Sequence, residues 1–237
     1  MDGSTFIDLP KKVHISKLTG KLAGFESISN NTTTNKFCFD RWQNAKVKND
    51  KAGKVVDICG VCYSHTMLNG MRKNMKPALD RNTFLAERLL NANELPTILA
   101  AFHRFSAHGE LLTEIVNPET GATIKKFGKY THIENFCRIA EHNPHCTFAL
   151  WSKRADIIKP FFDKRTKPVN LILIYSNPKT NHILKDTPKH FDRTFNNVQA
   201  DKFIEQQNCT GQKCAECMLC YTPNNGVKTI VEKIKKY

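Results

Sequence analysis

The chain has 237 residues, of which 40% are hydrophobic and 24% charged, and this composition excludes a collagenous, low-complexity or wholly disordered protein. Its formal net charge is +14, from 36 Lys and Arg residues against 22 Asp and Glu residues, so we expect an anionic partner, nucleic acid first and an acidic surface second. The longest apolar run, residues 170–175, is far shorter than the roughly 20 residues that span a bilayer, and residues 1–12 lack the apolar core of a secretory signal. We therefore expect a soluble cytoplasmic protein with no membrane partner, although a basic charge balance can also serve solubility alone.

The amino-terminal half contains few strong periodic signals. Residues 27–35 (SISNNTTTN) are rich in Ser, Thr and Asn, whose side chains bond to nearby backbone groups, and this predicts an ordered loop. Residues 43–54 are polar and lysine-rich, which predicts a connector. Residues 78–92 predict a helix with one apolar stripe, and residues 97–105 predict a buried strand after Pro96. The stripe consists of Leu79, Leu85, Ala86, Leu89 and Leu90.

The carboxyl-terminal half alternates between strand and helix patterns. In chain order we predict a hairpin-like excursion over residues 117–129, a helix over 131–143, a strand over 146–151, a helix over 154–163, a strand over 170–176 and a closing helix over 227–234. Thr131 and Glu134 have the spacing of a capping box, and Asn143-Pro144 ends the first of these helices.

Apolar rather than alternating strands, separated by helices over residues 97–176, are typical of a parallel sheet covered on both faces. We therefore predict an α/β fold with right-handed crossovers, either a partial β/α barrel or an open parallel sheet. The strands are too few for an eight-stranded barrel. The predicted organisation is an α/β domain over residues 1–208, with a loop-rich amino-terminal region, followed by a cysteine-rich, metal-bound segment and a closing helix over residues 209–237.

Polar residues follow each of the three predicted strands, at the strand ends where parallel α/β folds bind ligands. We predict that Arg104, His108 and Glu110 line a pocket as catalytic residues. Arg104 can hold a carboxylate or phosphate, His108 can act as an acid–base group or metal ligand, and Glu110 offers a carboxylate. The predicted cofactor-binding residues are Gly109, Lys153, Ser176 and Asn177. Taken alone, the pair Lys153 and Arg154 is better explained as the solvated start of a helix.

Strand alternation constrains Arg104 further. With Phe105 packed in the core, Arg104 points to the opposite face of the sheet, toward a ligand. A charged side chain there requires a partner, and the expected partner is Glu110 or a ligand anion. We expect Arg104 to be largely buried, and Glu110 to lie within one ligand's width of it and of a cysteine sulfur. The turn from Cys59 to Cys62 should form the rim of the pocket.

Four of the nine cysteines form the pattern C-x4-C-x2-C-x2-C near the carboxyl terminus. Two-residue spacers let successive thiolates reach one ion or cluster, and a reducing compartment disfavours disulfides, so this spacing predicts a metal centre. The predicted ligands are Cys209, Cys214, Cys217 and Cys220. A redox relay and simple burial are the alternatives, and the spacing does not distinguish zinc from an iron–sulfur cluster.

A second group comprises Cys38 and the pair Cys59 and Cys62. Three thiolates leave one coordination position open, as in catalytic metal sites, so we predict a second centre here, or one centre shared with the carboxyl-terminal cysteines. A thioredoxin-like redox pair would also explain Cys59 and Cys62, but no strand–helix pattern of that kind surrounds them. Cys137 and Cys146 lie in apolar patterns and are predicted core residues.

Several segments together resemble the phage "gene product 88" family. These segments are NTTTNKFC, CGVCYSHTMLNGMRKN, RFSAHGEL, FALWSKR, NLILIYSNP and NCTGQKCAECMLCY, which fall within residues 20–222. The resemblance covers almost the whole chain and implies a phage protein in the cytoplasm of an infected bacterium. It implies no particular chemistry.

A more distant resemblance is to the radical SAM enzymes. In those enzymes three cysteines hold a [4Fe–4S] cluster at one end of a partial β/α barrel, and a Gly-Gly-Glu segment takes the amino group of S-adenosylmethionine. Residues 107–110 (AHGE) are similar to that segment, with His108 in place of the first glycine. The C-x3-C-x2-C motif is absent, and a C-x2-C pair with Cys38 upstream stands in its place. The carboxyl-terminal cysteines resemble the auxiliary-cluster extensions of some of these enzymes.

The leading hypothesis is a phage iron–sulfur enzyme that acts on nucleic acid or a nucleotide. Its metal would be a [4Fe–4S] cluster or zinc, and S-adenosylmethionine is the cofactor that the second resemblance implies. The alternative is a non-enzymatic, zinc-stabilised protein that binds nucleic acid or a host factor. In both cases nucleic acid binds electrostatically, through lysine-rich residues 43–54 and residues 159–168.

Overall fold

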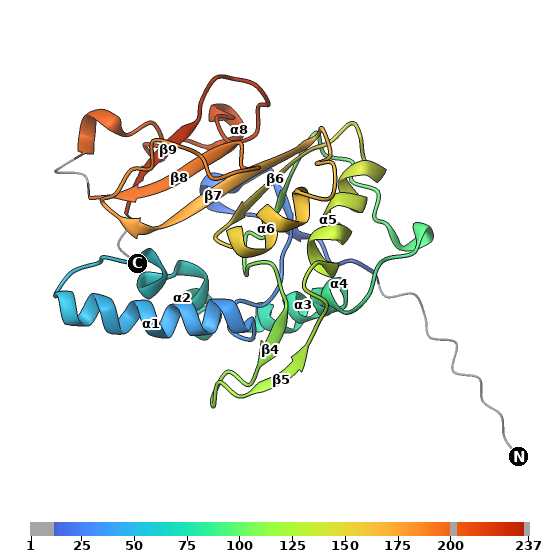
Figure 1. Ribbon diagram of the computed structural model, residues 1–237, viewed down its shortest axis with the longest axis horizontal. Coiled ribbons are helices and arrows are strands. Elements are labelled where there is room, and N and C mark those ends of the chain that lie inside the picture. The colour runs from blue at the N-terminus through green and yellow to red at the C-terminus, as the bar shows by residue number, and fades with distance from the viewer. Residues whose placement is uncertain (1–11, 200–202, 235–237) are drawn as a thin grey trace, which may run out of the picture.

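A seven-stranded sheet organises the fold in the computed structural model, which describes residues 12–199 and 203–234 (Figure 1). Its strands are β1 (Ser16–Lys17), β2 (Glu26–Ile28), β3 (Phe102–Phe105), β6 (Thr147–Ser152), β7 (Leu171–Thr180), β8 (Arg193–Val198) and β9 (Thr229–Lys233). Strand β1 pairs with β2 antiparallel, and from β2 to β9 every neighbouring pair is parallel. The strands follow one another across the sheet in chain order. The prediction of an α/β fold with a parallel sheet is confirmed.

Helices connect these strands. They are α1 (Lys36–Ala52), α2 (Tyr63–Asn69), α3 (Lys76–Asp80), α4 (Phe84–Glu87), α5 (Thr131–His142), α6 (Ala155–Phe162) and α8 (Cys214–Cys217). Short 3-10 turns are η1 (Gly20–Leu22), η2 (Ile58–Val61), η3 (Lys73–Met75), η4 (Arg81–Thr83), η5 (Ala92–Glu94) and η6 (Ile204–Gln206). The predicted hairpin-like excursion is present as β4 (Glu114–Val116) paired with β5 (Thr123–Lys126). None of the helices within the described ranges is long and apolar enough to cross a membrane.

The two faces of the sheet are covered differently. On one face, α4, α5 and α6 pack against apolar side chains of the central strands and form the main core. Phe105 of β3 lies at the centre of this core, stacked on Phe136 and Phe148. The other face carries a smaller apolar cluster around Ile174 and Tyr221, to which the cysteine-rich segment contributes. The second layer is therefore mostly irregular chain rather than the predicted helices.

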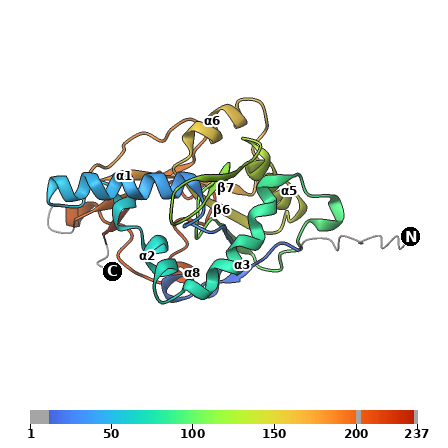
Figure 2. The same ribbon diagram turned by 90° about the horizontal axis from the view of Figure 1, so that it is seen from below.

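Helices α1 and α2 lie along the lower edge of the sheet in Figure 1 and in front of it when the molecule is seen from below (Figure 2). The connection from β2 to β3 contains both helices, and the turn η2 packs directly on α1. This connection brings the first three cysteines to the carboxyl ends of the strands.

The predicted connector over residues 43–54 is wrong, because most of it belongs to α1. This helix begins after Asn35, whose side chain accepts a hydrogen bond from Cys38 N, and it ends at Gly53 in the left-handed conformation. Its buried residues are Phe39, Ala45 and Asn49. So few buried positions in a long helix produce a weak apolar period, which explains why the sequence did not indicate it.

The predicted closing helix is also wrong. The segment forms strand β9, which pairs in parallel with β8, and Ile230 and Val231 are buried in the sheet. The apolar spacing fits a helix, but β-branched residues pack well on a sheet once a neighbouring strand is present. Neither β8 nor β2 was predicted. Strand β9 continues the sheet across the predicted domain boundary after residue 208.

Three predicted elements differ in detail from the structure. Helix α5 follows Tyr130 without a side-chain cap, and Glu134 binds Arg165 instead of forming a capping box. The predicted helix over residues 78–92 is divided into α3, η4 and α4, and Leu89 is exposed. Strand β3 is shorter than predicted because the chain before it bonds elsewhere, with Ile98 N donating to the Asn143 side chain.

Candidate metal and ligand site

The carboxyl ends of the parallel strands open into a cavity of about 500 Å³. Strand residues on its wall are Arg104, Trp151, Ser176, Phe195 and Asn197. Of the residues predicted from the sequence, the wall also includes Cys38, Cys59, Cys62, His108, Gly109, Glu110, Lys153, Cys209, Cys214 and Cys220. The tertiary structure therefore brings both cysteine groups and the first strand end to one place.

Two predicted residues lie outside this wall. The side chain of Asn177 donates to His182 O at 2.6 Å and to Asn196 Oδ1 at 3.0 Å. It supports the β7–β8 connection and does not face the cavity. Cys217 ends helix α8 and is also not part of the wall.

Cys38, Cys59 and Cys62 form the first thiol group. Cys38 lies in the first turn of α1, Cys59 lies within the turn η2, and Cys62 directly follows this turn, which packs on the same helix. Burial raises the pKa of Cys38, and the nearby Glu110 carboxylate and other two thiols raise it further. Burial also raises the pKa of Cys59 to about 11, against the opposing effect of the Lys153 ammonium group. The three sulfurs thus share one electrostatic environment.

The turn that carries two of these thiols is held by Asn49. Its side chain donates to Asp57 O at 2.9 Å and accepts from Val56 N at 2.8 Å and Asp57 N at 2.9 Å. A Cβ atom at Gly60 would lie 2.9 Å from the carbonyl carbon of Ala45, which is too close for any other residue. The glycine in the C-G-V-C motif therefore permits η2 to approach the helix.

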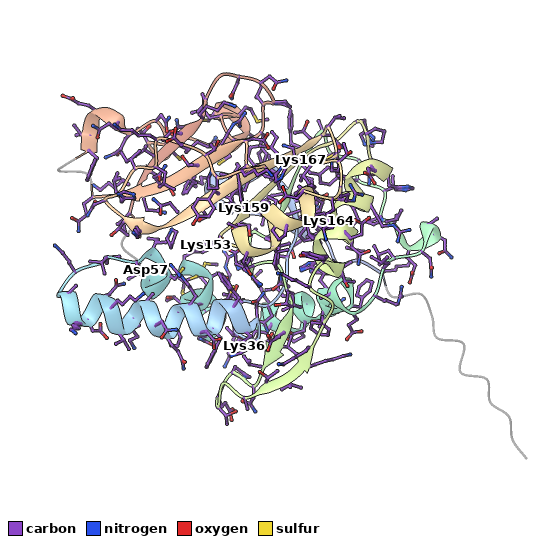
Figure 3. The ribbon with its side chains drawn as sticks, viewed as in Figure 1. Lys36, Asp57, Lys153, Lys159, Lys164 and Lys167 are labelled. Carbon is purple, nitrogen blue, oxygen red and sulfur yellow. The ribbon has the colours of Figure 1, made fainter. Side chains whose placement is uncertain are left out.

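Glu110 and Lys153 form a partly buried ion pair at the edge of the first thiol group. Glu110 accepts from Ser152 Oγ at 2.7 Å and from Lys153 N at 3.1 Å, and its Oε1 lies 3.8 Å from Lys153 Nζ. Burial alone lowers the pKa of Lys153, but Cys59 and Glu110 outweigh it and the net shift is upward. The prediction that Lys153 begins a solvated helix is wrong. Figure 3 shows Lys153 between the sheet and the α1–α2 layer.

The polar loop predicted over residues 27–35 is ordered and holds the segment after β3. Asn30 and Asn35 donate to Glu110 O at 2.8 and 2.9 Å, and Gly109 N donates to Thr32 Oγ1 at 2.8 Å. Gly109 has φ +74°, and a Cβ there would lie 2.8 Å from Asn30 O. Gly109 is thus required by this loop as well as lining the cavity. The sequence indicated the loop but not its role.

His108 is buried and neutral. Its Nδ1 lies 2.7 Å from Ser64 Oγ on α2. Burial lowers the pKa of His108 to about 4, and the Arg104 guanidinium adds to this shift. At neutral pH the ring is therefore an uncharged hydrogen-bonding group.

Cys209, Cys214 and Cys220 form the second thiol group. Cys214 and Cys220 pack against the apolar cluster on the open face of the sheet, and the Lys21 ammonium group lies 3.8 Å from Cys209 Sγ. Burial raises the pKa of Cys220 to about 12, and nearby Cys209 and Cys214 contribute. Within residues 12–199 and 203–234, no three His, Cys, Asp or Glu side chains converge on one position suited to a metal ion.

Arg104 lies on the cavity side of β3, opposite to Phe105, as strand alternation predicts. It is partly buried, and its guanidinium carbon lies 4.2 Å from the centre of the Trp151 ring. The expected pairing with Glu110 is wrong, because the Glu110 carboxylate is bound to Ser152 and Lys153.

Cys137 and Cys146 are fully buried in the main core, as predicted. Of the residues proposed as nucleic-acid contacts, several lysines of α1 are exposed, Lys159 lies in α6, and Lys164 and Lys167 follow that helix (Figure 3). The aromatic residues of the second segment, Phe161 and Phe162, are buried in the core. Lys167 is paired with Asp192.

Comparison with known proteins identifies neither a family nor a function for the chain. No family model matches the chain, and no curated protein and no solved structure matches it. The resemblances to the phage family and to the radical SAM enzymes therefore stay predictions from the sequence.

Proposed function

We propose that the protein is an iron–sulfur enzyme of the radical SAM-like type, in which Cys38, Cys59 and Cys62 hold a [4Fe–4S] cluster. The observation that carries this proposal is that these three thiols line one cavity at the carboxyl ends of β3 and β6 together with Glu110 and Lys153, close enough to influence one another's pKa. Three thiolate ligands leave one iron of such a cluster open to a small molecule.

The donor set fits this group. All three candidate ligands are sulfur, which iron–sulfur clusters prefer, and the Lys153 ammonium group favours the thiolate form of Cys59. When bound, the cluster supplies one electron for the reductive cleavage of S-adenosylmethionine. The chain itself supplies a polar wall beside the thiols, built from the ion pair of Glu110 and Lys153 and the neutral ring of His108.

Nucleic acid or a nucleotide is the proposed substrate class. The net charge of +14 favours a polyanion, and a cavity of about 500 Å³ is in the usual range for small-molecule and cofactor sites. We place the protein in the cytoplasm of an infected bacterium, following the resemblance to the phage family.

The carboxyl-terminal cysteines support a second proposal, a zinc-stabilised protein that binds nucleic acid or a host factor without catalysis. Cys209, Cys214 and Cys220 lie close enough to influence one another's pKa, on a segment with little regular structure. A structural metal at these thiols would order that segment. An auxiliary cluster at the same thiols is the corresponding proposal for an enzyme.

Metal analysis after anaerobic purification tests both proposals. The enzyme proposal expects a brown protein with iron and acid-labile sulfide in equal amounts, and formation of 5′-deoxyadenosine from S-adenosylmethionine with a reductant. Replacing Cys38, Cys59 and Cys62 together by Ser should remove that activity and part of the iron. Cys146→Ala, a core cysteine outside the cavity, is the matched control and should change neither. A colourless protein with stoichiometric zinc would favour the second proposal.

A further inference from the structure

Arg104 is a cavity cation whose charge the chain does not neutralise. Across the described residues, no carboxylate lies within ion-pair distance of its guanidinium group, and its Nε is buried without a hydrogen-bond partner. A buried cation without an anionic partner is unfavourable, and such positions are usually retained for a ligand.

Three other cations on the wall have carboxylate partners, and the remaining two, Lys17 and Arg72, are exposed to water. Lys153 pairs with Glu110 at 3.8 Å, and Arg41 pairs with Asp57 at 2.9 Å. Lys21 pairs with Glu232. Arg104 differs from these three because no carboxylate of the described residues pairs with it, and it lies on strand β3 itself, near Cys214 and Cys220.

The surroundings of Arg104 suit a ligand with an anionic group that can accept two hydrogen bonds side by side. The guanidinium stacks on Trp151, which leaves its edge available for the two parallel hydrogen bonds that carboxylates and phosphates accept. The Tyr221 hydroxyl is also buried and lies close enough to the Arg104 guanidinium for the two groups to interact. Phe195 and Tyr63 add further aromatic surface to the wall.

We propose that Arg104 and the Tyr221 hydroxyl form an anion-binding subsite that holds the carboxylate or phosphate of a small ligand whose body packs on the aromatic wall. This subsite depends on side chains that the enzyme proposal does not use as metal ligands. The proposal of an anion-binding subsite can therefore be tested separately from the proposal of a cluster.

The test measures binding of two anionic probes, inorganic phosphate and benzoate, to the full-length protein at constant ionic strength. Benzamide, which has the same ring as benzoate and no charge, controls for apolar burial. We expect at least one anion to bind, and Arg104→Met to weaken that binding at least about tenfold. Arg104→Lys keeps the charge but not the fork geometry and should bind with intermediate affinity.

Arg72→Met is the matched control, because Arg72 also lines the cavity but is exposed to water. It should leave the affinity for the probes almost unchanged. Arg104→Met should melt at the same temperature as the wild type or above it when no probe is present, since it removes an unpaired buried charge. Preference for phosphate or benzoate identifies the kind of ligand.

Three results would overturn the subsite. One is that neither anion binds the wild-type protein, and another is that Arg104→Met and Arg72→Met bind equally well. The third is that Arg104→Met loses its metal together with anion binding, which would make Arg104 a counter-charge for the thiolates. Metal content is measured on every variant, so loss of the anion effect with unchanged metal leaves the cluster proposal intact.

Discussion

Replacing Asn49 by Ala tests how helix α1 positions the turn that carries Cys59 and Cys62. Asn49 is buried and makes three hydrogen bonds to the backbone of residues 56 and 57, all between 2.8 and 2.9 Å. The substitution removes all three bonds without disturbing the helix backbone, because alanine has the highest helix propensity.

The expected loss follows from these bonds. Each contributes about 1 kcal/mol net, which gives about 3 kcal/mol for the three. Val56 is only partly buried, so water can replace part of the loss, and alanine returns a little helix stability. We therefore expect the free energy of unfolding to fall by about 2 kcal/mol and the melting temperature by roughly 4–8 °C for a chain of this size.

Urea unfolding followed by circular dichroism measures the loss, and Asn44→Ala is the matched control. Asn44 lies on the exposed side of the same helix, and its replacement should change stability by less than about 0.5 kcal/mol. In the metal-bound protein, Asn49→Ala should also lose its metal to a chelator at a higher rate than Asn44→Ala does. Equal unfolding midpoints for the two variants would show that the turn is not held by Asn49.

Three further predictions concern other parts of the molecule. Replacing Cys214 and Cys217 together by Ser should lower both metal content and melting temperature, because metal binding can supply on the order of 10 kcal/mol to a loop-rich segment; unchanged metal with unchanged melting would contradict this. His103 is buried, and neither of its ring nitrogens has a hydrogen-bond partner among the described residues; burial lowers its pKa to about 4, so its contribution to stability is present above about pH 6.5 and is lost as the pH falls toward 4. His103→Leu should therefore be more stable than the wild type at pH 5. A lower free energy of unfolding for the variant at that pH, measured by denaturant titration, would contradict this prediction. Nucleic-acid binding should weaken at least tenfold between roughly 50 and 200 mM salt, and a flat response in a fluorescence titration would leave the positive charge as a solubility feature.

Local patterns predicted the centre of the fold well. Helix α5 and strand β6 are within one residue of their predicted limits, because each buries many residues and so has a strong apolar pattern. Strand β7 begins within one residue of its predicted start but continues to Thr180, beyond the predicted end at residue 176. The sequence of strand β9 predicts a helix because its apolar residues have the helical spacing. The segment forms a strand because it pairs with β8, and this contact joins segments that are far apart in the sequence.

Residue types and spacing determined which groups are available for chemistry at the site. They identified the two cysteine groups, the charged strand ends and the polar loop over residues 27–35. They did not determine which of these groups meet. The pairing of Glu110 with Lys153 rather than Arg104 depends on the relative position of the ends of β3 and β6.

The tertiary structure alone decided that both cysteine groups and Arg104 line the same cavity. Cys38 and Cys59 are brought together by the packing of η2 on α1, and the carboxyl-terminal cysteines reach the open face of the sheet through β8 and β9. Sequence spacing constrains only groups within a turn or two of each other. Contacts across longer stretches of chain depend on which buried surfaces fit together, and that is a property of the whole fold.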